Sequence, residues 1–273
     1  ALIRKSDEEI AAEEEKNGGK KKIDNPGIDP IANREEGEAL VERIKDLPFV
    51  VTSVGKKDGR EFAPRLFDLT SLQVECNKKF AYSADETLKL IQSLYEKKVT
   101  TYPRVDTTFL SDDIYPKCPA ILKGLRDYEV LTAPLAGTTL PKSKKVFDNS
   151  KVTDHHAIIP TEQYVQLSAL SNEERRIYDL VVRRFLAVLL PPCVYEETVI
   201  QASIEKECFT ARGKRMVEKG WQEAYEDNRY DDEDEAKEEV REQNLPILQA
   251  GMKFDQPKIS LREGKTKPPA RFT

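Results

Sequence analysis

The stretch KKVTTYPRVDTTFLSDDI, residues 97–114, separates a helical part of the chain from a long polar one. It places Tyr102 among hydroxyl and charged side chains, whereas a tyrosine in a hydrophobic core needs apolar neighbours. Pro103 disfavours helical geometry at the residue before it, so we expect Tyr102 on a strand or at the end of a loop. The phenol is therefore predicted either to lie on a solvated loop or to be presented to a ligand.

Two helices are predicted immediately before this stretch. Apolar residues recur at helical spacing in the first helix: Leu69, Leu72, Cys76 and Phe80. Ser83 and Glu86 form an S-x-x-E capping box at the start of the second helix. Two helices joined by a few residues resemble a helix-turn-helix arrangement.

A long polar connection, residues 132–163, follows and then leads to the strongest helical pattern in the chain. A connection of this length is predicted to be either disordered or functional. The pattern SNEERRIYDLVVRRFLAVLLP begins with a second capping box, Ser171 and Glu174, and two prolines end it.

The two ends of the sequence are rich in β-branched residues and predict strands. We therefore predict a multidomain α+β fold with a discontinuous β-rich domain, residues 1–62 plus 191–273. A helical domain, residues 63–190, is inserted into it. Residues 1–35 carry charges and turn signals, so they are predicted to pack poorly apart from a short helix over Asp7–Lys16.

Composition excludes several classes of protein. No run of about 18 apolar residues occurs, and the first residues lack the apolar centre of a signal peptide, so we expect a cytoplasmic protein without membrane contact. The four cysteines are widely spaced and only two histidines are present, which argues against a zinc module and a disulfide framework. No metal site is predicted in this chain.

The net charge of −5 is unevenly distributed along the sequence. Residues 223–242 hold eleven acidic against three basic side chains, which leaves a net charge of +3 for the rest of the chain. A mildly basic remainder permits contact with phosphates but does not establish it.

Tyr102 and Arg104 suggest phosphoryl-transfer chemistry. A phenol is mostly protonated at neutral pH and is a weak nucleophile unless a cation or a base assists it. Arg104 lies two residues further along an extended segment and therefore projects to the same side as Tyr102. Its guanidinium could stabilise a developing phenolate and hold the attacked phosphate. The alternative is a partly exposed loop tyrosine beside a surface arginine.

His155 and His156, in the stretch VTDHHAIIPT, are the only histidines. They could bind phosphate or transfer a proton, or one of them could be a structural histidine near a helix start. They cannot both face one metal ion from an extended backbone, because neighbouring side chains point to opposite sides.

The stretch TTYPRVDTTFLSDDI resembles the active-site segment of type IA DNA topoisomerases. Three further stretches resemble segments of that family in the same order: residues 63–98 before the tyrosine, TDHHAIIPT after it, and FTARGKRMVEKGW with KPPARFT near the end. The form HHAIIPT is similar to the bacterial topoisomerase III branch. The resemblance covers roughly residues 34–273.

This resemblance implies that Tyr102 attacks a DNA backbone phosphate and forms a 5′-phosphotyrosyl link. The other strand then passes through, and the break is rejoined. It implies that Arg104 stabilises the phosphate or the phenolate, and that Asp106 and Thr107 support the segment close to the bound DNA. It also implies that His155 contacts single-stranded DNA near the cut, a contact that His156 could share.

The resemblance further implies that this chain is a fragment, the arch of the family's ring plus the domain with the tyrosine. The family's Mg²⁺-binding domain has no counterpart in the sequence, so we expect the fragment alone to be inactive. Its expected partners are single-stranded DNA and the remaining domains of a nucleoid-associated parent enzyme. Two rival classes are a tyrosine recombinase, which forms a 3′ link, and a non-catalytic helix-turn-helix DNA-binding module.

Overall fold

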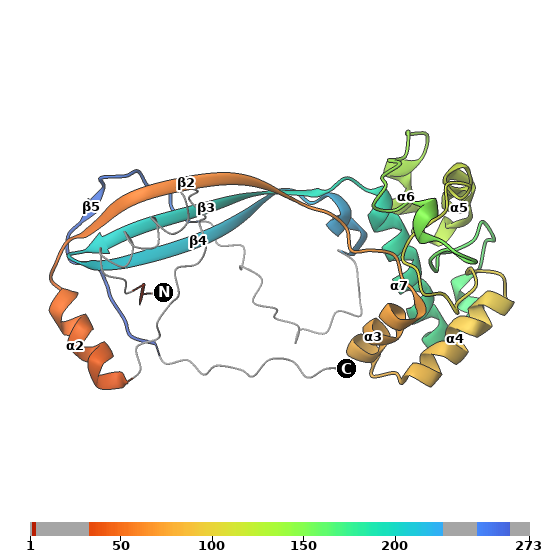
Figure 1. The fold of residues 1–273 in the computed structure, drawn as a ribbon, viewed down its shortest axis with the longest axis horizontal. Helices are drawn as coiled ribbons and strands as arrows, with labels where there is room; N and C mark the ends of the chain where they lie inside the picture. The colour runs from red at the N-terminus through yellow and green to blue at the C-terminus, as the bar shows by residue number, and fades with distance from the viewer. Residues whose placement is uncertain (1, 4–32, 226–244, 263–273) are drawn as a thin grey trace. The chain divides into compact units, whose positions relative to one another are not determined.

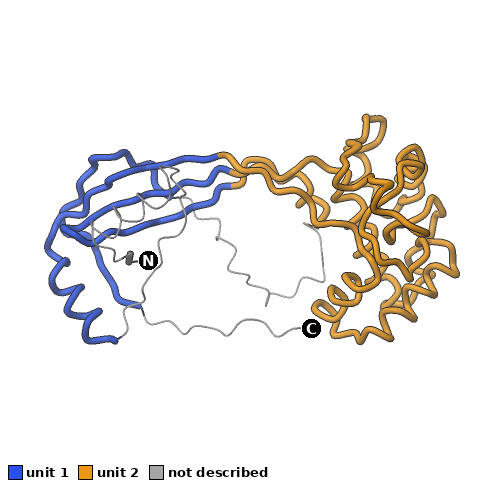
Figure 2. Tube along the Cα trace, in the orientation of Figure 1, with its two compact units in different colours: residues 1–57, 196–215, 240–273 blue, residues 58–195, 216–239 orange. Residues whose placement is uncertain are grey.

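The computed structural model describes residues 2–3, 33–225 and 245–262 and divides the chain into two compact units (Figure 2). Unit 1 comprises residues 1–57, 196–215 and 240–273, and unit 2 comprises residues 58–195 and 216–239. The predicted helix over Asp7–Lys16 and most of the acidic segment lie outside the described residues. The combination of helices with an antiparallel sheet confirms the predicted α+β class.

Three long strands form the centre of a five-stranded sheet: β2 (Phe49–Glu61), β3 (Cys193–Ile204) and β4 (Glu207–Glu218). The strand order is β1-β4-β3-β2-β5, and the short strands β1 (Leu2–Ile3) and β5 (Lys253–Phe254) pair antiparallel with their neighbours (Figure 1). Side-chain hydrogen bonds join Ser53 to Gln201 and Lys56 to Glu196. The residue numbers therefore rise along β2 as they fall along β3. These two strands are therefore antiparallel.

In unit 1, helix α2 (Arg34–Ile44) precedes β2. It begins at Asn33, whose side chain accepts a hydrogen bond from the Glu36 amide at 2.8 Å. Arg43 in its last turn forms a 2.5 Å ion pair with Glu207, which is largely buried at the start of β4. This ion pair attaches α2 to the sheet.

In unit 2, the helices α3 (Leu69–Phe80), α4 (Ala84–Glu96) and α7 (Asn172–Leu189) confirm the predicted ones. The capping boxes predicted for α4 and α7 are both present. Apolar side chains on one face of each helix are buried together: Leu72, Cys76, Ile91, Leu94, Ile177, Val181 and Phe185. Burial of these stripes fixes the three helices against one another.

The long polar connection is packed against the core of unit 2 and is not disordered. Its backbone pairs with Leu110, which donates to the Val146 carbonyl at 2.8 Å and accepts from the Asp148 amide at 2.9 Å. The side chain of Phe147 is buried between these contacts. The remaining elements are short: η1 (Tyr115–Lys117), α5 (Cys118–Gly124), η2 (Arg126–Tyr128), α6 (Glu129–Thr132), η3 (Ala133–Leu135), η4 (Asn149–Lys151), η5 (Leu167–Ala169) and η6 (Gly220–Tyr225).

The short helix η6 packs on α7 and contains the single tryptophan of the chain, Trp221. Buried Arg183 on α7 donates to the Asp179 carboxylate at 2.8 Å and to the Ala224 carbonyl at 2.6 Å. The indole N–H of Trp221 donates to the Glu61 carbonyl at 3.0 Å. All these residues belong to unit 2, so tryptophan fluorescence reports the unfolding of that unit.

Removing the Ser83 hydroxyl is expected to destabilise unit 2 by about 1 kcal/mol. Its oxygen accepts a hydrogen bond from the Glu86 amide at 3.2 Å, and Ser83→Ala leaves that amide without its cap. The free energy of unfolding would be measured by urea denaturation followed by Trp221 fluorescence. The control is Ser168→Ala, at an exposed position in η5, and equal effects of the two changes would contradict the role of the cap.

Candidate active site

The segment that carries Tyr102 leaves α4 and is held by backbone hydrogen bonds to the histidine-containing segment. Thr101 donates its amide to the Ile159 carbonyl at 3.0 Å, and the Thr161 amide donates to the Val99 carbonyl at 3.1 Å. These bonds form an isolated antiparallel bridge between Thr100 and Pro160. The segment before Tyr102 therefore pairs with a specific partner segment, residues 159–161.

The hydroxyl of Thr101 strengthens this connection. It donates to the Ala157 carbonyl at 3.3 Å and accepts the Ile159 amide at 3.0 Å. The next residues of the histidine segment are also fixed, because Ala157 and Ile158 donate their amides to the Phe109 and Phe67 carbonyls. Positions 101 and 155–159 are thus held in one register.

This register brings the Tyr102 ring against His155. The ring centroids are 4.5 Å apart at an interplanar angle of 41°. On another side, Tyr95 meets Tyr102 edge to face, with centroids 5.5 Å apart and an angle of 79°. Tyr102 is half-buried, so its ring is positioned by packing while part of the side chain stays accessible.

The residues that follow Tyr102 alternate between buried and exposed. Pro103 and Val105 are buried, whereas Arg104 and Asp106 are exposed. This pattern is the one expected for an extended segment with one face on the core. Arg104 therefore has the accessibility that contact with a bound phosphate requires.

Thr107 differs from these two exposed residues. Only 8% of it is exposed, and its hydroxyl donates to the Lys151 carbonyl at 2.7 Å. The same oxygen accepts the Phe109 amide at 3.2 Å. These contacts tie the end of the tyrosine segment to the polar connection.

The two histidines have different surroundings. His155 is exposed apart from its contact with the Tyr102 ring. His156 is half-buried, and its Nδ1 lies 2.8 Å from the Ala157 carbonyl oxygen. Desolvation lowers the pKa of His156 below its ordinary value, although this hydrogen bond partly opposes the shift. The structure therefore brings His155, and not His156, against the phenol.

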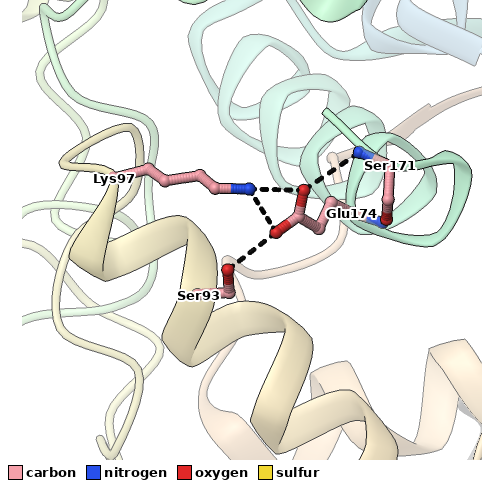
Figure 3. Close-up of polar contacts among 4 residues, drawn as sticks. All are labelled: Ser93, Lys97, Ser171 and Glu174. Atoms are coloured by element: carbon pink, nitrogen blue, oxygen red, sulfur yellow. Dashed lines mark hydrogen bonds and ion pairs between the residues drawn. The ribbon is translucent and has the colours of Figure 1, made fainter. Parts of the chain in front are cut away.

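A buried carboxylate anchors the end of α4, just before the Tyr102 segment (Figure 3). Both oxygens of Glu174, at the start of α7, lie within 2.6 Å of the Lys97 ammonium. Ser93 donates its hydroxyl at 2.7 Å and Ser171 donates its amide at 3.0 Å. Burial by itself would raise the pKa of Glu174, but the hydrogen bonds from Lys97, Ser93 and Ser171 outweigh it and lower the pKa.

Sequence reasoning did not identify Tyr95, Thr101 or the contact between Lys97 and Glu174 as parts of this region. Tyr95 carried one usable signal, because it is an aromatic residue at the edge of the apolar stripe of α4, one turn after Ile91. The contact between Lys97 and Glu174 joins residues 77 positions apart, so no pattern of neighbouring residues in the sequence could predict it.

Within the described ranges, no group of three or more histidine, cysteine, aspartate or glutamate residues could hold a metal ion. The acidic run Asp231–Glu235 lies outside those ranges. No helix among the described residues is long and apolar enough to cross a membrane.

Comparisons with known proteins agree with one another. A protein-family model described as DNA topoisomerase matches residues 8–273. DNA topoisomerase 3 from a strain of Bacillus cereus is 45% identical over 243 residues, and that of Bacillus subtilis is 42% identical over 243 residues. Each alignment covers 88% of this chain and 33% of the relative, so the chain spans about one third of the length of these curated relatives.

A solved structure, full-length topoisomerase I from Thermotoga maritima, matches with a TM-score of 0.56 at 23% sequence identity. The match covers 80% of this chain and 34% of that one. At this identity, the likeness concerns the fold alone.

Proposed function

Because the chain belongs to the type IA DNA topoisomerase family, we propose that Tyr102 is the nucleophile that cuts one strand of DNA. The observation that carries this proposal is the placement of a half-buried phenol against the exposed imidazole of His155, with centroids 4.5 Å apart. Exposed Arg104 follows on the same segment. A core tyrosine would have neither neighbour.

In the proposed step, the phenolic oxygen of Tyr102 attacks the phosphorus of a backbone phosphodiester. The bond between phosphorus and the 3′ oxygen breaks, the phenol loses its proton, and the departing 3′ oxygen gains one. The 5′ phosphate is then held as a tyrosyl ester. Attack by the same 3′ hydroxyl reverses the step and rejoins the strand after another strand has passed.

Arg104 and His155 would act on the phosphate in this step. A guanidinium forms charge-assisted hydrogen bonds to phosphate oxygens and favours the negative charge that develops there. His155, beside the phenol, would donate a hydrogen bond to the same group. Asp106, exposed on the same face, would lie near the DNA, and Thr107 would hold the segment in place.

We also propose that the discontinuous β-rich region, residues 1–62 plus 191–273, is the arch of the family's ring. Residues 63–190 would be the domain that carries the tyrosine, with α3 and α4 as its helix-turn-helix-like pair. Unit 1 gathers residues from both ends of the chain, which supports this assignment, although residues 216–239 group with unit 2.

Type IA DNA topoisomerases generally use Mg²⁺, which would offset the charge of the attacked phosphate. The described residues do not fit such an ion, since they contain no suitable cluster of ligands. No step is therefore assigned to a metal in this chain. We propose that Mg²⁺ is bound by another part of the enzyme, and that the 273-residue chain alone does not cut DNA.

The test uses the whole enzyme that contains this sequence, incubated with Mg²⁺ and end-labelled single-stranded DNA and then denatured. A 5′ link to the peptide that contains Tyr102 is expected, and the 273-residue chain alone should give no adduct. A 3′ link would instead indicate a tyrosine recombinase. Absence of any adduct with the whole enzyme would favour a non-catalytic helix-turn-helix DNA-binding module.

A further inference from the structure

A pocket lies beside Tyr102, at the C-terminal end of α4, and the proposed cleavage step gives no role to its other lining residues. Its volume is about 460 Å³, within the range of sites that bind small ligands. The residues that line it carry one basic, one acidic and several hydroxyl groups: Tyr95, Glu96, Lys98, Thr100, Thr101, Tyr102 and Thr161. Because Tyr102 forms part of the wall, an occupant of the pocket would lie next to the attacking phenol.

Lys98 adopts an unusual backbone conformation in this pocket. Its φ angle is 62°, in the left-handed region that residues other than glycine seldom adopt. Its amide donates to the Tyr95 carbonyl at 2.8 Å, and the Thr161 hydroxyl donates to its carbonyl at 2.6 Å. Glycine would end the helix with less strain, so a strained and exposed lysine suggests a function for its charge.

Tyr95 and Thr100 offer two further kinds of contact to an occupant of the pocket, a ring that can stack and a hydroxyl that can form a hydrogen bond. Tyr95 is 38% exposed, and its edge-to-face contact with Tyr102 orients the ring. Such a ring can stack against a nucleic-acid base. Thr100 is 2% exposed, and its hydroxyl has no hydrogen-bond partner within the described part of the chain. A hydrogen bond with an occupant of the pocket would satisfy this hydroxyl.

We propose that this pocket binds one nucleotide of single-stranded DNA, next to the phosphate that Tyr102 attacks. The base stacks on Tyr95, the phosphate contacts Lys98, and the Thr100 hydroxyl bonds to an edge of the base. This inference rests on the proposed function, because the nucleotide belongs to the strand that is cut.

The first test combines Tyr95→Leu with oligonucleotides that each lack one base. Binding to the whole enzyme would be measured by fluorescence anisotropy. Tyr95→Leu is expected to weaken binding of the intact oligonucleotide about 10-fold, as the loss of one stacked base does. At one position, removing the base should weaken binding to the unchanged enzyme by as much as Tyr95→Leu does. The Tyr95→Leu variant should bind that abasic oligonucleotide no more weakly than it binds the intact one. The control is Tyr164→Leu, at a tyrosine of similar exposure, 39%, outside the pocket.

The second test separates the charge of Lys98 from its backbone strain. Lys98→Gly is expected to raise the urea midpoint of unit 2, read from Trp221 fluorescence, because glycine adopts positive φ freely. It should nevertheless weaken oligonucleotide binding. The slope of the logarithm of the binding constant against the logarithm of the salt concentration should become shallower by about one, because one contact to a phosphate is lost. The control is Ala81→Gly, at φ 58°, which should raise the midpoint without changing binding.

Three outcomes would overturn the proposal. In the first, the losses of affinity caused by Tyr95→Leu and by an abasic position are additive at every position of the oligonucleotide. In the second, Lys98→Gly leaves DNA binding unchanged. A loss of cleavage without any loss of DNA binding would indicate that the pocket contacts another part of the enzyme. Failure of the proposed function is distinguishable, because then the unchanged enzyme forms no adduct whatever the binding data show.

Discussion

Replacing Tyr102 with phenylalanine is expected to reduce covalent attachment of DNA by the whole enzyme to an undetectable level. The phenyl ring keeps the contacts with His155 and Tyr95 but has no oxygen to form the phosphate ester. Single-stranded DNA binding should change by less than about threefold, because the other contacts to the phosphate remain. Attachment would be measured by gel electrophoresis of end-labelled DNA after denaturation.

The matched control for this change is Tyr164→Phe, which also removes one hydroxyl from unit 2 but lies outside the site. It should leave attachment unchanged. The Trp221 unfolding curve of Tyr102→Phe should match that of the unchanged chain, which would exclude misfolding as the cause. An adduct that persists in Tyr102→Phe on another peptide, such as the one that contains Tyr95, would remove Tyr102 from its proposed role.

Local patterns predicted the parts of this fold whose causes are local. The capping boxes of α4 and α7 and the non-helical geometry at Tyr102 depend on residues within a few positions of one another. The alternating exposure of residues 103–106 is what an extended segment with one face on the core produces.

Features that depend on distant partners could not be predicted in this way. The residue pattern alone did not separate His155 from His156, and the register set by Thr101 brings His155 against Tyr102. Thr107 was a candidate near the DNA, and its contact with Lys151 is visible only in the folded chain. The pairing of β2 with β3 joins residues about 140 positions apart, for which a strand pattern gives no register.

The ion pair between Lys97 and Glu174 supplies the second large effect. Lys97→Met is expected to destabilise unit 2 by about 2–3 kcal/mol, because it leaves a buried carboxylate without its cation. The side chain of Glu174 is 8% exposed, whereas that of Lys97 is 43% exposed. Glu174→Gln should therefore cost only about 1 kcal/mol, since Lys97 can be hydrated and the amide oxygen can still accept the Ser171 amide.

Two matched variants make this prediction specific. Lys89→Met removes the cation of an exposed pair on the same helix, 2.6 Å from Asp85, and should leave the urea midpoint unchanged. The double variant Lys97→Met with Glu174→Gln should be less destabilised than the sum of its parts, since no buried charge remains. If Glu174→Gln were the more damaging single change, the burial argument would be wrong.

The pH dependence of the same pair has a definite sign. The folded-state pKa of Glu174 lies below its ordinary value of 4.5, so the unfolded chain takes up a proton more readily than the folded one. The stabilisation is therefore fully present above that value and is lost as the pH falls through the folded-state pKa. Urea midpoints of the unchanged chain and of Glu174→Gln, read from Trp221 fluorescence, should converge as the pH is lowered below 4.5. A difference that persisted unchanged at low pH would show that the carboxylate charge is not what joins α4 to α7.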